Sequence, residues 1–231
     1  MKRFWRTAAA SPQGPDYAIL LDGRPVRTPK GRPLLLPTRA LAQAVAAEWQ
    51  EVGAQVDPRA MPATGIANAA IDLVAPDVSR FAADLASYAA SDLTCYRADH
   101  PPALVARQVA AWEPVLKALE ERHGLLFRRT VGVVPVAQPP ATLARVVALL
   151  EAMSPFSLAA LQPIVSLSGS LVLALALRDG VLTAEDCFAA GALDADWQAE
   201  QWGVDAEAAA QRAARRHLFL EAARFLALAE G

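Results

Sequence analysis

The stretch Tyr17-Ala-Ile-Leu-Leu21-Asp22-Gly23-Arg24-Pro-Val-Arg-Thr28 decides the fold of the first part of the chain. Its apolar beginning predicts a short strand, and Asp22-Gly23 is a dipeptide typical of a tight hairpin turn. Prolines at positions 25, 29, 33 and 37 cannot donate hydrogen bonds to a sheet, so the strands around them are expected at edges or ends. The stretch therefore predicts a small antiparallel β unit that must pack against another element.

Helical periodicity begins at Thr38 and continues through most of the remaining chain. The first helix ends near Gly53, and a proline-punctuated linker follows at 56–62. Further helices are predicted at 65–74, 78–91, 102–123, 141–153, 157–178, 183–193 and 205–229. The 52 alanines and 30 leucines also favour helices. We predict an α+β fold class, with a small antiparallel β-rich N-terminal domain at 1–55, which includes one trailing helix, and a larger, mostly α-helical C-terminal domain at 56–231.

Composition excludes several classes of protein. The chain has 231 residues, of which 54% are hydrophobic and 20% charged, so it is not disordered. Its net charge of −2 argues against a general nucleic-acid binder. The most apolar stretch, 161–177, contains a proline and three serines and is too short to span a membrane, which predicts a buried helix. Two cysteines, Cys95 and Cys187, form no disulfide framework and suit a reducing cytosol.

Sequence signals for catalysis are weak. Phosphate-binding glycine loops and the Gly-x-Ser-x-Gly elbow do not occur in the sequence, and the three histidines form no metal-binding pair. We therefore predict no catalytic residues, no metal and no cofactor. Cys95 and His100, with Asp92 nearby, are a nucleophile, a base and an acid by identity alone. They leave a small soluble enzyme as an alternative, and a generic helical protein-binding scaffold is another.

The segment Trp197-Gln-Ala-Glu200-Gln-Trp202-Gly-Val-Asp205 places two large aromatic residues in a polar setting between two predicted helices. On a helical turn Trp197 and Glu200 would share a face, because they are three residues apart. One interpretation is that both rings fill the joint between the helices. The other is an acidic, aromatic docking point for a partner protein, since tryptophan is enriched at interface hot spots.

The chain resembles a known family along nearly its whole length. The family is the ATP synthase assembly chaperone that acts on the alpha subunit of the catalytic sector. The resemblance is carried by Asp22-Gly-Arg-Pro-Val-Arg-Thr-Pro29, Ala47-Glu-Trp49, Met61-Pro62, Ala70-Ile-Asp72, Asp92-Leu93, Cys95-Tyr-Arg97, Gly169-Ser-Leu-Val-Leu-Ala-Leu-Ala-Leu177 and the tryptophan-flanked segment up to Asp205.

This resemblance implies a chaperone without enzyme activity. Such a protein binds the unassembled alpha subunit transiently and prevents its aggregation until the beta subunit replaces it, with no nucleic acid, membrane insertion or small-molecule substrate involved. The important acids of the family match Glu200 and Asp205, and together with Trp197 and Trp202 these are the predicted partner-binding residues. The expected location is the bacterial cytoplasm, and the mitochondrial matrix for eukaryotic relatives.

Overall fold

The computed structural model describes residues 2–132, 134–203 and 205–231. Its residues group into two compact units. Unit 1 comprises Met1–Val78, Ser154–Leu161 and Glu221–Gly231, and unit 2 comprises Ser79–Met153 and Gln162–Leu220. The chain therefore returns to unit 1 twice after first leaving it, whereas the sequence predicted a single division between 1–55 and 56–231. That division stays a prediction.

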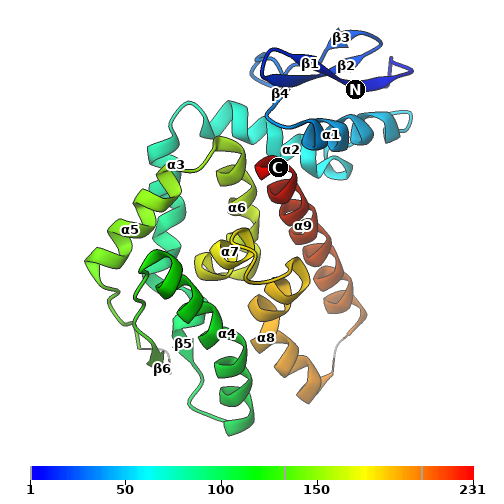
Figure 1. The fold of residues 1–231 in the computed structure, drawn as a ribbon. Helices are drawn as coiled ribbons and strands as arrows, with labels where there is room; N and C mark the ends of the chain where they lie inside the picture. Colours follow the sequence, from blue (N-terminus) through cyan, green and yellow to red (C-terminus); the bar gives the residue numbers. More distant parts are fainter. Residues whose placement is uncertain (1, 133, 204) are drawn as a thin grey trace. The chain divides into compact units, whose positions relative to one another are not determined.

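Four short antiparallel strands form the sheet of unit 1 (Figure 1). They are β1 (Ala8–Gln13), β2 (Asp16–Leu21), β3 (Arg24–Pro25) and β4 (Leu35–Leu36). β1 pairs with β2 along its whole length, while β3 and β4 pair with opposite ends of β2. Asp22 and Gly23 connect β2 to β3 with φ angles of 46° and 79°, the left-handed conformation that a two-residue hairpin turn requires. The predicted hairpin is confirmed.

Helix α1 (Arg39–Glu51) packs its apolar face in the same unit. The Thr38 hydroxyl caps its first turn by accepting a hydrogen bond from the backbone N–H of Leu41 at 3.1 Å. Near its end, Trp49 contacts Trp5 edge to face at 5.3 Å between ring centroids. The short 3₁₀ helix η1 (Pro58–Ala60), helix α2 (Pro62–Ala69) and the π-helical turn η2 (Ala70–Val74) follow.

Glu48 joins α1 to α2 through hydrogen bonds. Its carboxylate accepts from the backbone N–H groups of Ala63 and Thr64 and from the Thr64 hydroxyl, each at 2.7 Å. These N–H groups belong to the first turn of α2, which has no side-chain cap of its own. Burial raises the pKa of Glu48. The carboxylate of one helix thus serves as the N-terminal cap of the next.

Unit 2 is built mainly from helices (Figure 1). In chain order the elements are α3 (Val78–Ala86), η3 (Ser87–Ser91), η4 (Leu93–Cys95), β5 (Tyr96–Arg97), α4 (Pro102–His123), β6 (Thr130–Val131), α5 (Pro140–Glu151), α6 (Pro155–Ser168), α7 (Leu171–Arg178), α8 (Ala184–Trp202) and α9 (Ala206–Glu230). Helices α6 and α9 each contribute residues to both units. The fold class predicted from sequence, a small N-terminal sheet with a larger helical part, is confirmed.

Helix α7 lies at the centre of unit 2. Every residue from Leu171 to Ala176 is at most 1% exposed, and the helix contacts both α4 and α8. The buried helix predicted at 161–177 is thus confirmed for 171–176, whereas Gln162 and Ser166 of α6 are exposed. Within the described ranges, no helix combines the length and the apolarity needed to cross a membrane.

Two helix boundaries predicted from sequence were wrong. The helix predicted at 157–178 is two helices, because Gly169 takes a φ of 72° and Ser170 then caps α7 through the N–H of Leu173. The helix predicted at 183–193 begins with the expected Thr183 cap but continues to Trp202. Its later turns contain acidic residues, a composition that is also typical of a linker. Asp196 is held by an ion pair with Arg212, and Asp194 accepts a hydrogen bond from Gln108.

Candidate partner-binding surface

The second half of α8 carries three of the four predicted partner-binding residues. Trp197 and Glu200 lie within the helix, and Trp202 is its last residue. The interpretation of this segment as a polar joint between helices was therefore wrong. Because the backbone is helical, Trp197 and Glu200 do share one face, as their spacing predicted.

Arg107 of α4 meets this face of α8. Its Nη1 lies 2.8 Å from each carboxylate oxygen of Glu200, and its Cζ lies 4.6 Å from the centroid of the Trp197 ring. The hydrogen bond to Glu200 raises the pKa of Arg107, which stays a cation throughout the physiological range. Both charged side chains are about half exposed, at 49% and 50%. The arrangement combines a carboxylate, a guanidinium and an aromatic face at the protein surface.

Trp202 and Asp205 have different surroundings. Trp202 is 80% exposed, so its ring does not fill the joint between helices. Asp205 precedes α9, and its Oδ1 accepts a hydrogen bond from the N–H of Ala208 at 2.7 Å, which caps that helix. The structure thus joins Glu200 to Trp197 through Arg107 and gives Asp205 a separate contact. Tryptophan is enriched at interface hot spots, so this exposed ring is a candidate contact point.

A groove of about 710 Å³ runs beside this cluster. Trp197 and Trp202 form part of its wall, together with Arg97, His100 and other polar or charged residues. These include Asp99, Gln108, Asp194, Gln198 and Gln201. A second groove of about 480 Å³ lies between α8 and α9, and Trp202 lines this groove as well. The exposed ring therefore stands where the two grooves meet.

Gln108 is a buried residue in the lining of the first groove. Its amide oxygen accepts from the N–H of Ala98 at 2.7 Å, and its amide nitrogen donates to Asp194 at 2.8 Å. One buried side chain of α4 thereby ties α8 to the segment that follows β5. The roles of Gln108 and Arg107 could not be predicted from sequence, because their partners on α8, Asp194 and Glu200, lie 86 and 93 residues away in the chain.

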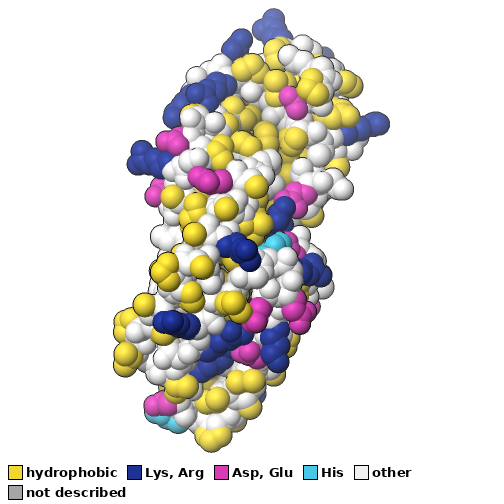
Figure 2. All heavy atoms as spheres, turned by 60° about the vertical axis from the view of Figure 1, so that its left-hand side comes forward, with side chains coloured by type: hydrophobic (Ala, Val, Ile, Leu, Met, Phe, Trp, Pro, Cys, Tyr) yellow, Lys and Arg dark blue, Asp and Glu magenta, His cyan; other side chains and the backbone are white. Residues whose placement is uncertain are grey.

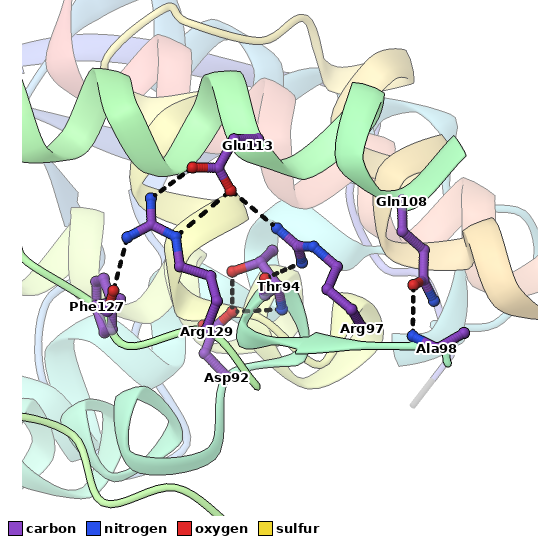
Figure 3. A network of polar contacts seen from close by, with 8 residues as sticks. All are labelled: Asp92, Thr94, Arg97, Ala98, Gln108, Glu113, Phe127 and Arg129. Atoms are coloured by element: carbon purple, nitrogen blue, oxygen red, sulfur yellow. Dashed lines mark hydrogen bonds and ion pairs between the residues drawn. The ribbon is translucent and has the colours of Figure 1, made fainter. Parts of the chain in front are cut away.

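A second polar network centres on Glu113 of α4 (Figure 3). Glu113 lies between two guanidinium groups and accepts hydrogen bonds from Arg97 at 3.4 Å and from Arg129 at 3.0 Å. Arg97 is 7% exposed, and its Cζ lies 5.0 Å from the Trp112 ring centroid. Burial lowers the pKa of Arg97. These contacts join β5, α4 and the segment before β6.

Two further ion pairs attach α9 to α8. Arg212 donates from Nε and Nη2 to the two oxygens of Asp196, at 2.8 and 2.6 Å. Arg216 also uses two nitrogens, Nε and Nη2, on the two oxygens of Glu185. On the face drawn in Figure 2, basic and acidic side chains are likewise interspersed among hydrophobic ones. Such a mixed surface suits a protein partner better than a uniformly charged polymer.

The three residues of the alternative enzyme site have very different surroundings. Cys95 is fully buried, and burial raises the pKa of its thiol to about 12. The carboxylate of Asp92 is buried and accepts hydrogen bonds from Thr94, Ser170 and Val172. His100 is exposed, with its Nδ1 2.5 Å from Asp99. A buried neutral thiol lacks the accessible thiolate character that a nucleophile needs.

We expect both cysteines to resist alkylation in the folded protein. The pKa of Cys187 is also raised to about 12 by burial, so at pH 8 neither thiol ionises appreciably. Iodoacetamide labelling followed by mass spectrometry should proceed at least about 100-fold more slowly in the native state than in urea. Rapid, selective native labelling of Cys95 would instead revive the enzyme alternative.

Among the described residues, no three His, Cys, Asp or Glu side chains are grouped closely enough to hold a metal ion.

The chain is similar to a known family, to a curated relative and to solved structures. The model of the family described as "ATP12 chaperone protein" matches residues 2–120. The mitochondrial protein atp12 of Schizosaccharomyces pombe is 24% identical over 219 residues, which cover 87% of this chain and 74% of that protein. The crystal structure of Atp12 from Paracoccus denitrificans superposes with a TM-score of 0.92 at 43% identity, covering 99% of this chain and 98% of the other.

A mutant of the Paracoccus protein, in which lysine replaces an aspartate, superposes equally well. Its TM-score is 0.93 at 42% identity, with 99% of this chain and 97% of that chain covered. The chain therefore belongs to the ATP12 chaperone family. The family resemblance predicted from its sequence motifs is confirmed.

Proposed function

We propose that this protein is an ATP synthase assembly chaperone that binds the unassembled alpha subunit of the catalytic sector. It keeps this client from aggregating until the beta subunit replaces it. The observation that carries the proposal is membership of the ATP12 chaperone family, supported by a fold shared with Paracoccus Atp12 over 99% of the chain. We expect it to act in the bacterial cytoplasm, by binding alone and without a chemical reaction.

The chaperone must cover a surface that its client exposes only before assembly. A subunit that belongs in a ring exposes an apolar face while it is alone, and such faces associate with one another. A chaperone that covers this face competes with the proper neighbour. Hand-off then requires the beta subunit to bind the alpha subunit more tightly than the chaperone does. An interface of about 1,600 Å² would suffice for a specific but displaceable complex.

We place the client contact on the second half of α8 and the start of α9. Trp202 offers a large exposed aromatic side chain between two grooves, the kind of residue that dominates interface energetics. Glu200 offers a carboxylate whose charge sets the orientation of the bound client. Trp197 gives this carboxylate an aromatic neighbour, and Asp205 caps the start of α9.

Purified subunits test the proposal directly. Immobilised protein should capture the alpha subunit, and added beta subunit should release it in proportion to its concentration. A generic scaffold predicts no preference for the alpha subunit, and an enzyme predicts no lasting complex. Failure to capture the alpha subunit, or capture that the beta subunit leaves unchanged, would contradict the proposed function.

A further inference from the structure

We propose that Glu200 and Trp197 form a binding site for an arginine side chain of the client, and that Arg107 occupies this site in the free protein. The inference rests on the proposed function, because the client is the alpha subunit. It adds the chemistry of the group that is recognised and a residue of this chain that competes with it.

The local geometry selects a guanidinium group. Glu200 presents two carboxylate oxygens beside the Trp197 ring, so a planar cation can pair at its edge and stack on its face. A guanidinium satisfies both contacts at once, because it is flat and carries donors along its edges. A lysine ammonium offers a compact point charge and cannot stack in this way. Arg107 shows the class of ligand that the site accepts.

Arg107 uses the site incompletely. It reaches both oxygens of Glu200 through the single nitrogen Nη1. The two other arginine pairs described on α8, with Asp196 and with Glu185, each place two different nitrogens on two oxygens. The two-nitrogen arrangement is the favoured geometry for an arginine and a carboxylate. The Glu200 carboxylate therefore retains its best hydrogen-bonding geometry for another guanidinium.

Arg107 is also easy to displace. Its side chain and that of Glu200 are about half exposed, so water competes with their ion pair and little is lost when it opens. The adjoining groove gives a polypeptide room beside the site, and its lining carries two acidic side chains, Asp99 and Asp194, and two basic ones, Arg97 and His100. A client arginine can thus approach through this groove and exchange with Arg107.

Arg107 is then an internal competitor, and its removal should strengthen client binding. If it occupies the site about four-fifths of the time, Arg107→Gln should bind the alpha subunit about 5-fold more tightly than the wild type. Arg216→Gln is the matched control, because it removes an arginine from the Glu185 pair on the same helix. We expect its affinity for the alpha subunit to equal that of the wild type.

A titration with small molecules tests the arginine site in the absence of the client. N-acetylarginine amide and N-acetyllysine amide are added to ¹⁵N-labelled protein, and the Trp197 indole N–H signal is followed, assigned with Trp197→Phe. In Arg107→Gln the arginine probe should shift this signal at about 5-fold lower concentration than in the wild type. The lysine probe should give a much smaller shift, and Arg216→Gln should behave as the wild type.

The outcomes distinguish the two proposals. Equal responses to the two probes, or unchanged or weaker alpha-subunit binding by Arg107→Gln, would overturn the arginine site while the chaperone function stood. A wild-type protein that binds no alpha subunit would contradict the chaperone function, and the probe titration would still report on the arginine site.

Discussion

Replacing Glu200 by lysine is expected to abolish capture of the alpha subunit while the fold survives. The substitution places a cation where the client presents one, so attraction becomes repulsion. A desolvated charge pair at an interface centre is costly to break, and we expect affinity to fall by at least about 30-fold. The fold should tolerate the change, because the Glu200 side chain is 50% exposed. Calorimetric titration measures the affinity, and thermal unfolding should show a Tm within about 2 °C of the wild type.

Glu185→Lys provides the matched control. Glu185 lies on the same helix and also pairs with an arginine at the surface, so the charge change and the lost ion pair are equivalent. Its position in the first turn of α8 makes a lysine there at least as unfavourable for folding. If both variants lose the client equally, or if Glu200→Lys unfolds, Glu200 has a structural role and the docking surface is wrongly placed.

The largest effect on stability is expected for Asp92→Ala. One oxygen of Asp92 accepts from the Thr94 N–H, the Thr94 hydroxyl and the Ser170 hydroxyl at 3.0, 2.7 and 2.7 Å. The other accepts from the N–H of Val172 at 2.9 Å. A single carboxylate with no exposed surface therefore serves the starts of both η4 and α7. Alanine would leave these buried donors without an acceptor, at a cost of about 3–5 kcal/mol in the free energy of unfolding.

Urea unfolding measures this cost. Asp84→Ala, which removes an exposed carboxylate of α3, should stay within about 0.5 kcal/mol of the wild type. Asp92→Asn keeps one acceptor oxygen and should fall between the two. An unfolding midpoint for Asp92→Ala equal to that of Asp84→Ala would show that the Asp92 network does not hold α7 in place.

Local signals in the sequence predicted the elements that depend on local chemistry. Asp22-Gly23 produced the expected hairpin, and Thr183 began α8 as its capping pattern indicated. The break at Gly169-Ser170 was missed because apolar residues continue on both sides of it. The local signal, a helix-ending glycine followed by a capping serine, was hidden by this apolar run, and Asp92 adds a tertiary hydrogen bond to Ser170 from a position 78 residues away.

The candidate surface was predictable in part. Glu200 and the two tryptophans stood out as residue types, and the spacing of Trp197 and Glu200 correctly placed them on one face. The exposure of the Trp197 ring depends on Arg107 of α4, which no local pattern encodes. The pairing of Arg107 with Glu200 could not be predicted, because the two residues are 93 positions apart and many arginines were available.

Aggregation of the isolated alpha subunit tests the central claim most directly. Light scattering of purified alpha subunit should stay low when an equimolar amount of wild-type protein is present, and it should rise with Glu200→Lys as quickly as with no chaperone. Glu185→Lys should protect as well as the wild type. Scattering that rises equally fast with and without the wild-type protein would contradict the account.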